Sequence, residues 1–586
     1  MLWMLDLPID KGTPAVFHQV LDPLHSVTGD TLLALVPVAS LLVMLGVLRI
    51  NAWRSVIIGS AITILLGIVA WHTPTGAAFA AYGLGAATGV WSIDWIVFWG
   101  VVIYNTMVRT GAFDDLKRWL IAQATVDVRV QALLMAWAFG ALMEGLVGFG
   151  YPWAVVAPIL IALGVVELDA IRVAALANNA PVSFGALGAP IIGLAAVTGL
   201  PLLALSAAIG KIVAILALFP PWVLIYLVSG KRGLRDGWPL AVVGSLAYIA
   251  GQFPTAVYLG PYLPDIFGSL VCFAALLLLL KVWRPRTILG FGGRELTKEE
   301  VAAAAAAGTV GGGAQVAGGP LAGGRPGTGL TADAPGAPGR SWSPASARAA
   351  ARGLVPFGIL VAVVIGWTGP WSPLPSYLAY KPAVKAVSSL GHALVSADWK
   401  YAPFVAGTAI LASWLLILPY LRPGWSALRG TFADTFRQMW GALLVGPLIY
   451  GLAYVFNFSG MANSMANGFS KVGTVYIVLA ALLGWIGVAL SGSNTSTNAV
   501  FGQFQYTVAR LLGAPVLLFP SLNSVGAEVG KPVAPQTASV GVSTSGFVRN
   551  EGEVIRHNMA WTFVILAFLI GIGCLYFFVL PGAMRL

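Results

Sequence analysis

The chain has 586 residues, of which 58% are hydrophobic and only 9% are charged, and its mean hydropathy is +0.85. Soluble domains carry roughly 25% charged residues because their surfaces face water, so the composition excludes a soluble enzyme, a nucleic-acid-binding protein and a secreted disulfide scaffold. The 70 glycines and 11% aromatic residues are typical of helical membrane proteins with closely packed helices. We therefore predict an all-α polytopic membrane protein.

Stretches of about 20 mainly apolar residues can each cross the hydrocarbon core of a membrane. In chain order they are 32–50, 53–71, 91–108, 201–228, 238–257, 265–282, 354–372, 403–421, 438–457 and 558–581. Two further regions, 131–200 and 474–548, are apolar but are interrupted by Gly, Pro, Ser and Asn. Together they predict roughly twelve membrane crossings plus broken or re-entrant segments.

The chain divides into four parts. Residues 1–31 form an acidic lead-in, and residues 32–293 and 353–586 form two transmembrane halves, each of which contains one interrupted region. Residues 294–352 are rich in Ala, Gly and Pro and have almost no large apolar side chains. Such a segment cannot pack a core, so it is predicted to be a flexible linker between the halves.

The basic residues orient these parts. The loops around 49–54, 109–130, 230–237, 281–352 and 422–437 contain 21 of the 33 Lys and Arg residues. Because cytoplasmic loops are enriched in Lys and Arg, these loops are predicted to be cytoplasmic and the N-terminus to lie outside. The net charge of +11 is thus explained by membrane topology and does not indicate a nucleic-acid partner.

Two pairs of similar segments indicate an internal duplication. GALMEG at 140–145 resembles GVALSG at 487–492, and each ends an apolar stretch. A Pro-Val pair then follows in both halves, 37 residues after Glu144 and 41 residues after Ser491. The charge map makes the two copies antiparallel, as in inverted-repeat transporters, whose broken helices meet near the midplane to form the binding site.

Glu144 is a carboxylate at the end of an apolar stretch, and such residues are costly in a membrane unless they have a function or a partner. It is a candidate proton carrier, or alternatively a structural cap on the broken backbone. The glycines that would open the two breaks are Gly145, Gly148, Gly150 and Gly492.

Polar side chains near the breaks are candidate substrate ligands. The segment 491–498 is rich in hydroxyl and amide groups, which could bind a carboxylate and a hydroxyl, although an interfacial loop has a similar composition. Lys531 could neutralise an anion or pair with Glu528, and Lys211 could bind an anion or extend to the membrane interface. The full set of candidates is Asn178, Asn179, Ser183, Lys211, Ser491, Ser493, Asn494, Thr495, Ser496, Asn498, Lys531 and Gln536.

Other sites are not indicated. The five histidines are scattered without metal-ligand spacing, and the sequence contains neither a phosphate-binding loop nor a dinucleotide-binding fingerprint. We therefore expect no metal, no cofactor and no ATP hydrolysis by this chain. An intramembrane enzyme would need a catalytic dyad or a metal set, and the sequence contains none that we recognise.

Several long segments resemble the L-lactate permease family of bacterial inner-membrane carriers. They are WSIDWI (91–96), TGAFDDL (110–116), EGLVGFGYP (144–152), NNAPVSFGALGAPI (178–191), GWIGVALSGSNTSTNAVFG (484–502) and EVGKPVAPQTASVG (528–541). The resemblance covers nearly the whole chain outside the linker. It implies a proton symporter that takes up L-lactate, and often glycolate, across the inner membrane, with membrane lipid as its surroundings and a homo-oligomer as a compatible state.

The resemblance also implies residue roles. The family's acidic residue before the first break corresponds to Glu144, and its basic residue in the last motif corresponds to Lys531. Asn494 replaces a carboxylate that is often found in the family. Because the amide cannot carry a proton in the same way, this difference favours Glu144 as the proton carrier. The alternative hypothesis is a Na⁺-coupled carrier of another small organic acid that uses the hydroxyls of 491–498 as ion ligands.

Overall fold

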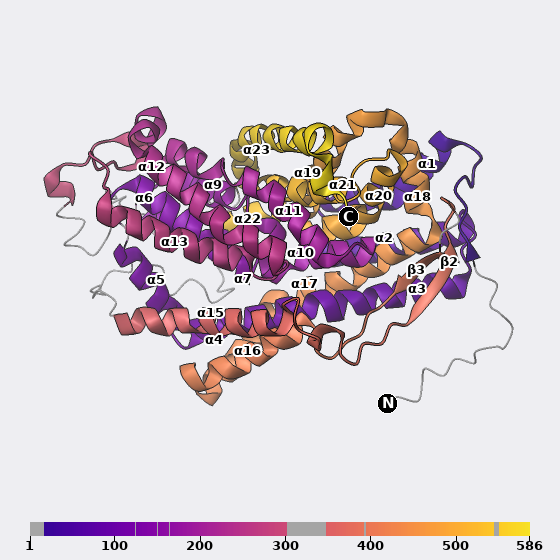
Figure 1. Ribbon diagram of the computed structural model, residues 1–586, viewed down its shortest axis with the longest axis horizontal. Coiled ribbons are helices and arrows are strands. Elements are labelled where there is room, and N and C mark those ends of the chain that lie inside the picture. Colours follow the sequence, from indigo (N-terminus) through magenta and orange to yellow (C-terminus); the bar gives the residue numbers. More distant parts are fainter. Residues whose placement is uncertain are drawn as a thin grey trace.

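The computed structural model describes residues 17–123, 125–148, 150–162, 164–301, 347–391, 394–543 and 550–586. It is a predominantly helical structure whose long axis lies horizontally in Figure 1. Most of the predicted linker, 302–346, lies outside the described residues.

The first half contains thirteen described α-helices and a π-helical turn, η2 (Gly89–Asp94), that joins α3 to α4. The π-helical residues Ala132–Phe139 join α6 to α7, so that the two form one continuous helical stretch. The bounds of the helices are α1 Val27–Leu42, α2 Ala52–Val69, α3 Thr75–Thr88, α4 Trp95–Arg109, α5 Ala112–Gln123, α6 Val128–Gln131, α7 Gly140–Leu146, α8 Tyr151–Ala162, α9 Glu167–Ala177, α10 Gly185–Thr198, α11 Leu202–Leu216, α12 Pro220–Tyr258 and α13 Pro264–Val282.

The second half repeats the same kinds of element. Its helices are α15 Ala347–Thr368, α16 Ala406–Leu421, α17 Trp425–Ser459, α18 Met461–Phe469, α19 Tyr476–Ser491, α20 Asn494–Leu511, α21 Leu518–Gly530, α22 Pro535–Ser543 and α23 Glu551–Cys574. Both halves contain a 3₁₀ turn at a Pro-Val pair, η4 (Val182–Phe184) before α10 and η8 (Lys531–Val533) before α22. The order helix, break, helix, helix, 3₁₀ turn, helix is therefore common to α7–α10 and α19–α22, as expected for a duplication.

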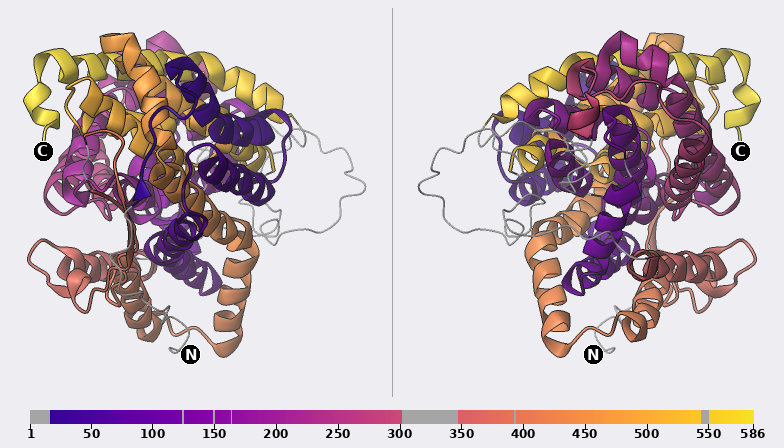
Figure 2. Two further views of the ribbon diagram at one scale, coloured as in Figure 1. Left: turned by 90° about the vertical axis from the view of Figure 1, so that its right-hand side faces the viewer. Right: turned by 90° about the vertical axis from the view of Figure 1, so that its left-hand side faces the viewer.

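The helices form two groups. The first helix group consists of α2, α3, α4, α5, α15, α16 and α17, and the second consists of α6–α13 and α18–α23. In Figures 1 and 2, α15 and α16 lie along one side of the molecule, and α23 lies on the opposite side. The α6–α7 helix belongs to the second group, and every residue from Val128 to Leu146 is buried, as expected for a helix that is apolar on nearly all sides.

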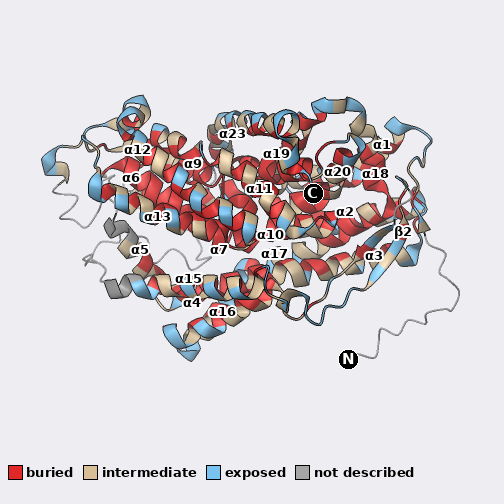
Figure 3. Ribbon diagram, viewed as in Figure 1, coloured by how far each residue is buried: buried red, intermediate tan, exposed pale blue. Residues whose placement is uncertain are grey.

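Nine helices of the described residues are long and apolar enough to cross a membrane, or ten if the pair α9 and Val182–Thr198, bent by 66°, is one span. Large apolar side chains such as Leu65, Leu278 and Phe563 are exposed on the outside, and Figure 3 shows the buried residues inside both groups. An exposed apolar surface of this kind is suited to lipid. The protein is therefore a multi-pass membrane protein, and the count of twelve crossings stays a prediction.

Three details differ from the spans predicted from hydropathy. The expected span 201–228 is interrupted, because α11 ends at Leu216 and α12 begins at Pro220. The expected span 91–108 is the second part of a 35-residue helical stretch that begins at Thr75. A small sheet that we did not predict joins β1 (Phe17–His18), β2 (Ala383–Val387) and β3 (Leu394–Asp398), because β2 and β3 are too short and too polar to register as spans.

A buried ion pair fixes the start of the helix that leads to Glu144. Arg129 is fully buried, and its Nη2 lies 2.6 Å from Asp127 Oδ2. Arg129 also donates to the carbonyl oxygens of Gly233 and Thr287, while Asp127 accepts a hydrogen bond from the Leu289 amide. The pair thus ties α6 to α12 and to the segment that follows α13.

Arg129→Ala should destabilise the protein strongly, because it leaves the Asp127 carboxylate buried without its cation, at a cost of about 3–5 kcal/mol. The expected result is a clear fall in the midpoint of thermal unfolding in detergent. Arg232→Ala is the matched control, since its partner Glu295 is about half exposed and such surface pairs contribute about 0–1 kcal/mol. Equal midpoints for the two variants would contradict the anchoring role of Arg129.

Candidate functional site

Glu144 lies in the last turn of α7, immediately before the first break in the chain. Its side chain is 2% exposed. The helix ends there because Val147 is already irregular and Gly148 adopts a positive φ of 66°, a conformation that glycine tolerates without strain. The carboxylate therefore lies deep in the second helix group, at an interruption of the backbone.

Two partners hold this carboxylate. Lys531 Nζ donates to Glu144 Oε1 at 2.7 Å, and Asn178 Nδ2 donates to Glu144 Oε2 at 2.9 Å. Lys531 begins the 3₁₀ turn η8, and Asn178 caps the end of α9. The backbone at Gly185 also approaches closely, since a β-carbon there would lie 2.6 Å from Glu144 Oε1. The ion pair thus joins the breaks of the two halves.

A second polar cluster also joins the two halves. Ser183 Oγ donates to Glu528 Oε2 at 2.5 Å and lies 3.3 Å from Ser524 Oγ. Asn498 Nδ2 donates to Ser524 Oγ and to the carbonyl oxygen of Pro190. The alternative pairing of Lys531 with Glu528 is therefore not the one adopted, because Lys531 binds Glu144 and Glu528 is bound by a serine.

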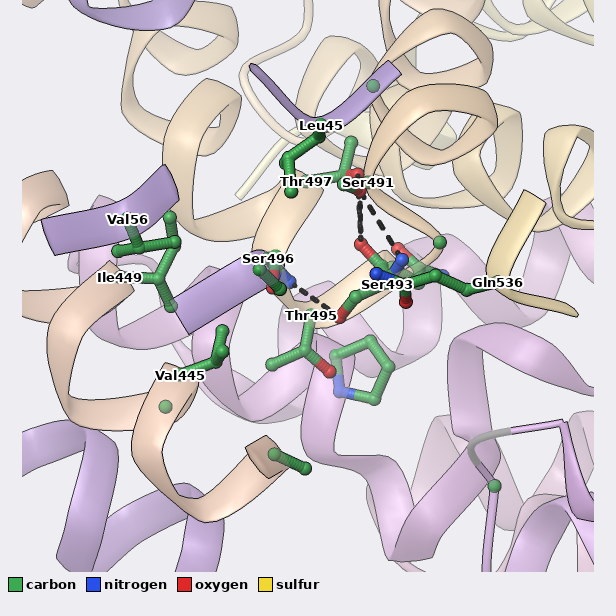
Figure 4. A pocket seen from close by; sticks show the side chains of 18 of the residues that line it. Leu45, Val56, Val445, Ile449, Ser491, Ser493, Thr495, Ser496, Thr497 and Gln536 are labelled. Atoms are coloured by element: carbon green, nitrogen blue, oxygen red, sulfur yellow. Dashed lines mark hydrogen bonds between the residues drawn. The ribbon is translucent and has the colours of Figure 1, made fainter. Parts of the chain in front are cut away.

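A cavity of about 500 Å³ lies beside the Glu144–Lys531 pair. Residues of both helix groups line it, and both α20 and α22 begin at its wall. Figure 4 shows labelled hydroxyl side chains of 491–497 around the turn that precedes α20, and labelled apolar side chains of Leu45, Val56, Val445 and Ile449 elsewhere in the pocket. Helix N-termini carry partial positive charge, so the lysine and these helix starts make the polar side of the cavity suited to an anion.

Most of the sequence candidates gather at this cavity. The lining includes Glu144, Gly148, Ser491, Gly492, Ser493, Asn494, Thr495, Ser496, Lys531 and Gln536. Asn178 and Ser183 lie directly behind the wall, bonded to Glu144 and Glu528.

Other candidates lie away from the cavity. Lys211 Nζ donates to the carbonyl oxygen of Ala583 at 2.7 Å, so it binds the C-terminal segment of the chain. Asn498 is fully buried in the second polar cluster. Gly145 faces Asp265, because a β-carbon at Gly145 would lie 2.7 Å from Asp265 Cβ, and Gly150 lies against Thr537 of α22.

Sequence reasoning missed three buried or cavity-lining polar groups. Asp94 and Tyr450 line the cavity from the first helix group, and Asp265 is buried beside Gly145, where its Oδ1 accepts a hydrogen bond from the Tyr248 hydroxyl at 2.9 Å. The signal that singled out Glu144, a carboxylate within or next to an apolar stretch, applies equally to Asp94 and Asp265. Among the described residues, no group of three or more His, Cys, Asp or Glu side chains could hold a metal ion.

Known proteins resemble this chain over most of its length. The L-lactate permease family matches residues 30–580. Glycolate permease GlcA of Escherichia coli (strain K12) is 32% identical over 574 residues, which cover 94% of this chain and 96% of that protein. The L-lactate permease of Bacillus subtilis (strain 168) is 30% identical over 561 residues, which cover 92% of this chain and 94% of that protein.

A solved structure of Neisseria gonorrhoeae MtrF aligns with 92% of this chain and 97% of its own, at 13% identity and a TM-score of 0.47. The family match and the two relatives confirm the resemblance inferred from the sequence motifs. The chain therefore belongs to the L-lactate permease family, a family of membrane transporters and not of enzymes.

Proposed function

We propose that the protein takes up L-lactate, and glycolate or related 2-hydroxy monocarboxylates, by symport with protons across the bacterial inner membrane. The observation that carries the proposal is the buried Glu144–Lys531 pair at the wall of the cavity. The names of the relatives, a glycolate permease and an L-lactate permease, support the substrate class.

The ion pair offers a direct way to couple a proton to an anion. While Glu144 is ionised, its carboxylate occupies the Lys531 ammonium. A proton on Glu144 removes that charge and leaves a buried cation without a partner, which is strongly unfavourable. The carboxylate of a substrate can then take the place of Glu144 on Lys531, so one proton and one anion bind together and the charge of the site stays the same.

The wall of the cavity supplies the remaining contacts for a small hydroxy acid. Ser493 caps α20 by accepting a hydrogen bond from the Ser496 amide, so the first turn of α20 presents its other amides and hydroxyls to the cavity. The Oδ1 atom of Asn494 is buried and has no hydrogen-bond partner among the described residues. These groups are suited to the carboxylate and the 2-hydroxyl of the substrate, because a substrate hydroxyl can satisfy an otherwise unpaired amide oxygen.

The cavity extends to Asn51 and Trp53 at the start of α2, which the positive-inside rule places on the cytoplasmic side. A second cavity, of about 750 Å³, is lined by Lys381, Asp398 and Lys400 on the predicted outer side. We interpret the described conformation as open to the cytoplasm, with the N-terminus outside. Transport would then alternate access to the ion pair between the two cavities.

Glu144→Gln should abolish accumulation of labelled L-lactate driven by an inward proton gradient in proteoliposomes, because the amide cannot carry the proton. Exchange of internal for external lactate should survive, since Lys531 is then permanently free to bind the anion. Glu295→Gln changes an exposed carboxylate and is the matched control, which should accumulate lactate as wild type does. Accumulation that requires Na⁺ and ignores the proton gradient would reject the proposal in favour of a Na⁺-coupled carrier.

Lys531→Gln should raise the KM for lactate about 10–100-fold, because a hydrogen bond to a charged group contributes about 1.5–3 kcal/mol. Lys211→Gln should leave the KM unchanged, because that lysine binds the Ala583 carbonyl outside the cavity. Since Lys531→Gln also leaves Glu144 without its cation, the double variant Glu144→Gln/Lys531→Gln separates loss of folding from loss of binding. Equal KM values for the two lysine variants would contradict the role of Lys531.

The orientation can be tested by thiol labelling of intact cells. Asn51 and Lys400 are both exposed and lie at opposite cavities. In a Cys574→Ser background, with Cys272 buried, a membrane-impermeant maleimide should label Lys400→Cys in intact cells and Asn51→Cys only after the membrane is opened. The reverse pattern would place the N-terminus in the cytoplasm.

A further inference from the structure

Asp94 is a carboxylate on the wall of the same cavity, but it belongs to the other helix group. It is the last residue of the π-helical turn η2, inside the 35-residue helical stretch Thr75–Arg109. Glu144 and Lys531 line the cavity from the second helix group, whereas Asp94 lines it from the first. A carboxylate within a membrane-spanning helix is a functional candidate by default.

No hydrogen bond or ion pair of Asp94 occurs within the described residues. The carboxylate lies against the backbone of α17, because a β-carbon at Gly446 would lie 2.7 Å from Asp94 Oδ2. The Tyr450 hydroxyl, one turn further along α17, lines the same cavity, is fully buried and also has no partner among the described residues. This side of the cavity thus contains a partly exposed carboxylate and a buried hydroxyl, neither with a partner among the described residues.

No cation faces Asp94 from the elements packed against η2, which are α3, α4, α10, α16 and α17. Their cationic side chains are Arg109, Arg429 and Arg437, which lie roughly 13–25 Å along their helices from Asp94 or Gly446 at 1.5 Å per residue. Arg109 and Arg437 both pair with Asp434. The other titratable groups of these elements are Tyr82, Tyr104, Tyr420, Tyr450 and Tyr454, of which Tyr450 lines the cavity with Asp94.

This placement conflicts with an anionic ligand if Asp94 is ionised. When a substrate carboxylate takes the place of Glu144 on Lys531, the negative charge moves from the buried wall into the cavity that Asp94 lines, so an ionised Asp94 would repel it. Like charges that face one cavity repel each other, and a carboxylate that is partly buried without a partner is less well solvated than in water. Protonation of Asp94 removes both penalties, and the cavity, which reaches the loop at Asn51, gives the proton a path from water.

We propose that Asp94 is a second proton-binding residue of the cavity, protonated whenever the monocarboxylate is bound. The inference rests on the proposed function, in which Glu144 takes up the first proton. It adds a second proton to the binding reaction, so that binding of one monocarboxylate is linked to the uptake of two protons, one on each helix group.

The test is the pH dependence of L-lactate and glycolate binding to the full-length protein in lipid nanodiscs, measured by calorimetry on the alkaline side of neutrality. By linkage, the association constant falls tenfold per pH unit for each proton taken up with the ligand. Wild type should therefore lose about 100-fold in affinity per pH unit, and Asp94→Asn should lose about tenfold. Asp236→Asn, the same change at an exposed residue of α12 that lines neither cavity, should behave as wild type.

The outcomes separate this inference from the proposed function. A wild-type slope in Asp94→Asn overturns the role of Asp94, whereas a wild-type slope in Glu144→Gln overturns the assignment of the first proton. If wild type binds neither acid, the substrate class fails, and infrared difference spectra still test Asp94. A carboxylic-acid C=O band that appears between alkaline and neutral pH in wild type and in Asp236→Asn should be missing in Asp94→Asn, and its persistence in Asp94→Asn overturns the inference.

Discussion

The structure of the site depends on one constraint, that a lysine ammonium buried inside the protein needs a negative partner. Lys531 is 5% exposed, and the Glu144 carboxylate supplies that partner from a residue 387 positions away in the sequence. An unpaired ion at either position would be strongly destabilising, so the two broken regions are held face to face. The cavity, its polar wall and the starts of α20 and α22 are arranged around that pair.

Irregular backbone makes the contact possible. Ala186 and Leu187 have positive φ values of 47° and 57°, which non-glycine residues adopt only where the surroundings enforce them. This strained turn brings the backbone at Gly185 against Glu144, where a side chain would collide with the carboxylate. Ser183 and Asn498 satisfy groups of the opposite half across the same interface. The breaks are thus stabilised by each other and not by their own helices.

Composition and hydropathy were enough to predict a helical membrane protein, whereas the division into two transmembrane halves stays a prediction. The same reasoning picked out Glu144 and Lys531 separately, because each is a charge in or beside an apolar stretch. It could not predict their pairing, or that Lys211 binds the C-terminal segment, because both depend on which helices meet in space. Asp94 was not predicted as a candidate site residue, because it lies between Trp91 and Trp95 in a segment whose composition is that of an ordinary membrane span.

The balance of charge in the interior explains why a single lysine can govern binding. Three buried carboxylates, Glu144, Asp265 and Glu528, lie near Lys531, the one buried lysine among the described residues. Tyr248 donates to Asp265 and Ser183 donates to Glu528, so these two carboxylates have neutral donors. Glu144 is the carboxylate that pairs with the Lys531 ammonium. An anion that enters the cavity therefore competes with one protein carboxylate for one ammonium. In the proposed function a proton neutralises that carboxylate, and competition for Lys531 then links proton binding to anion binding without any further charged group at the pair.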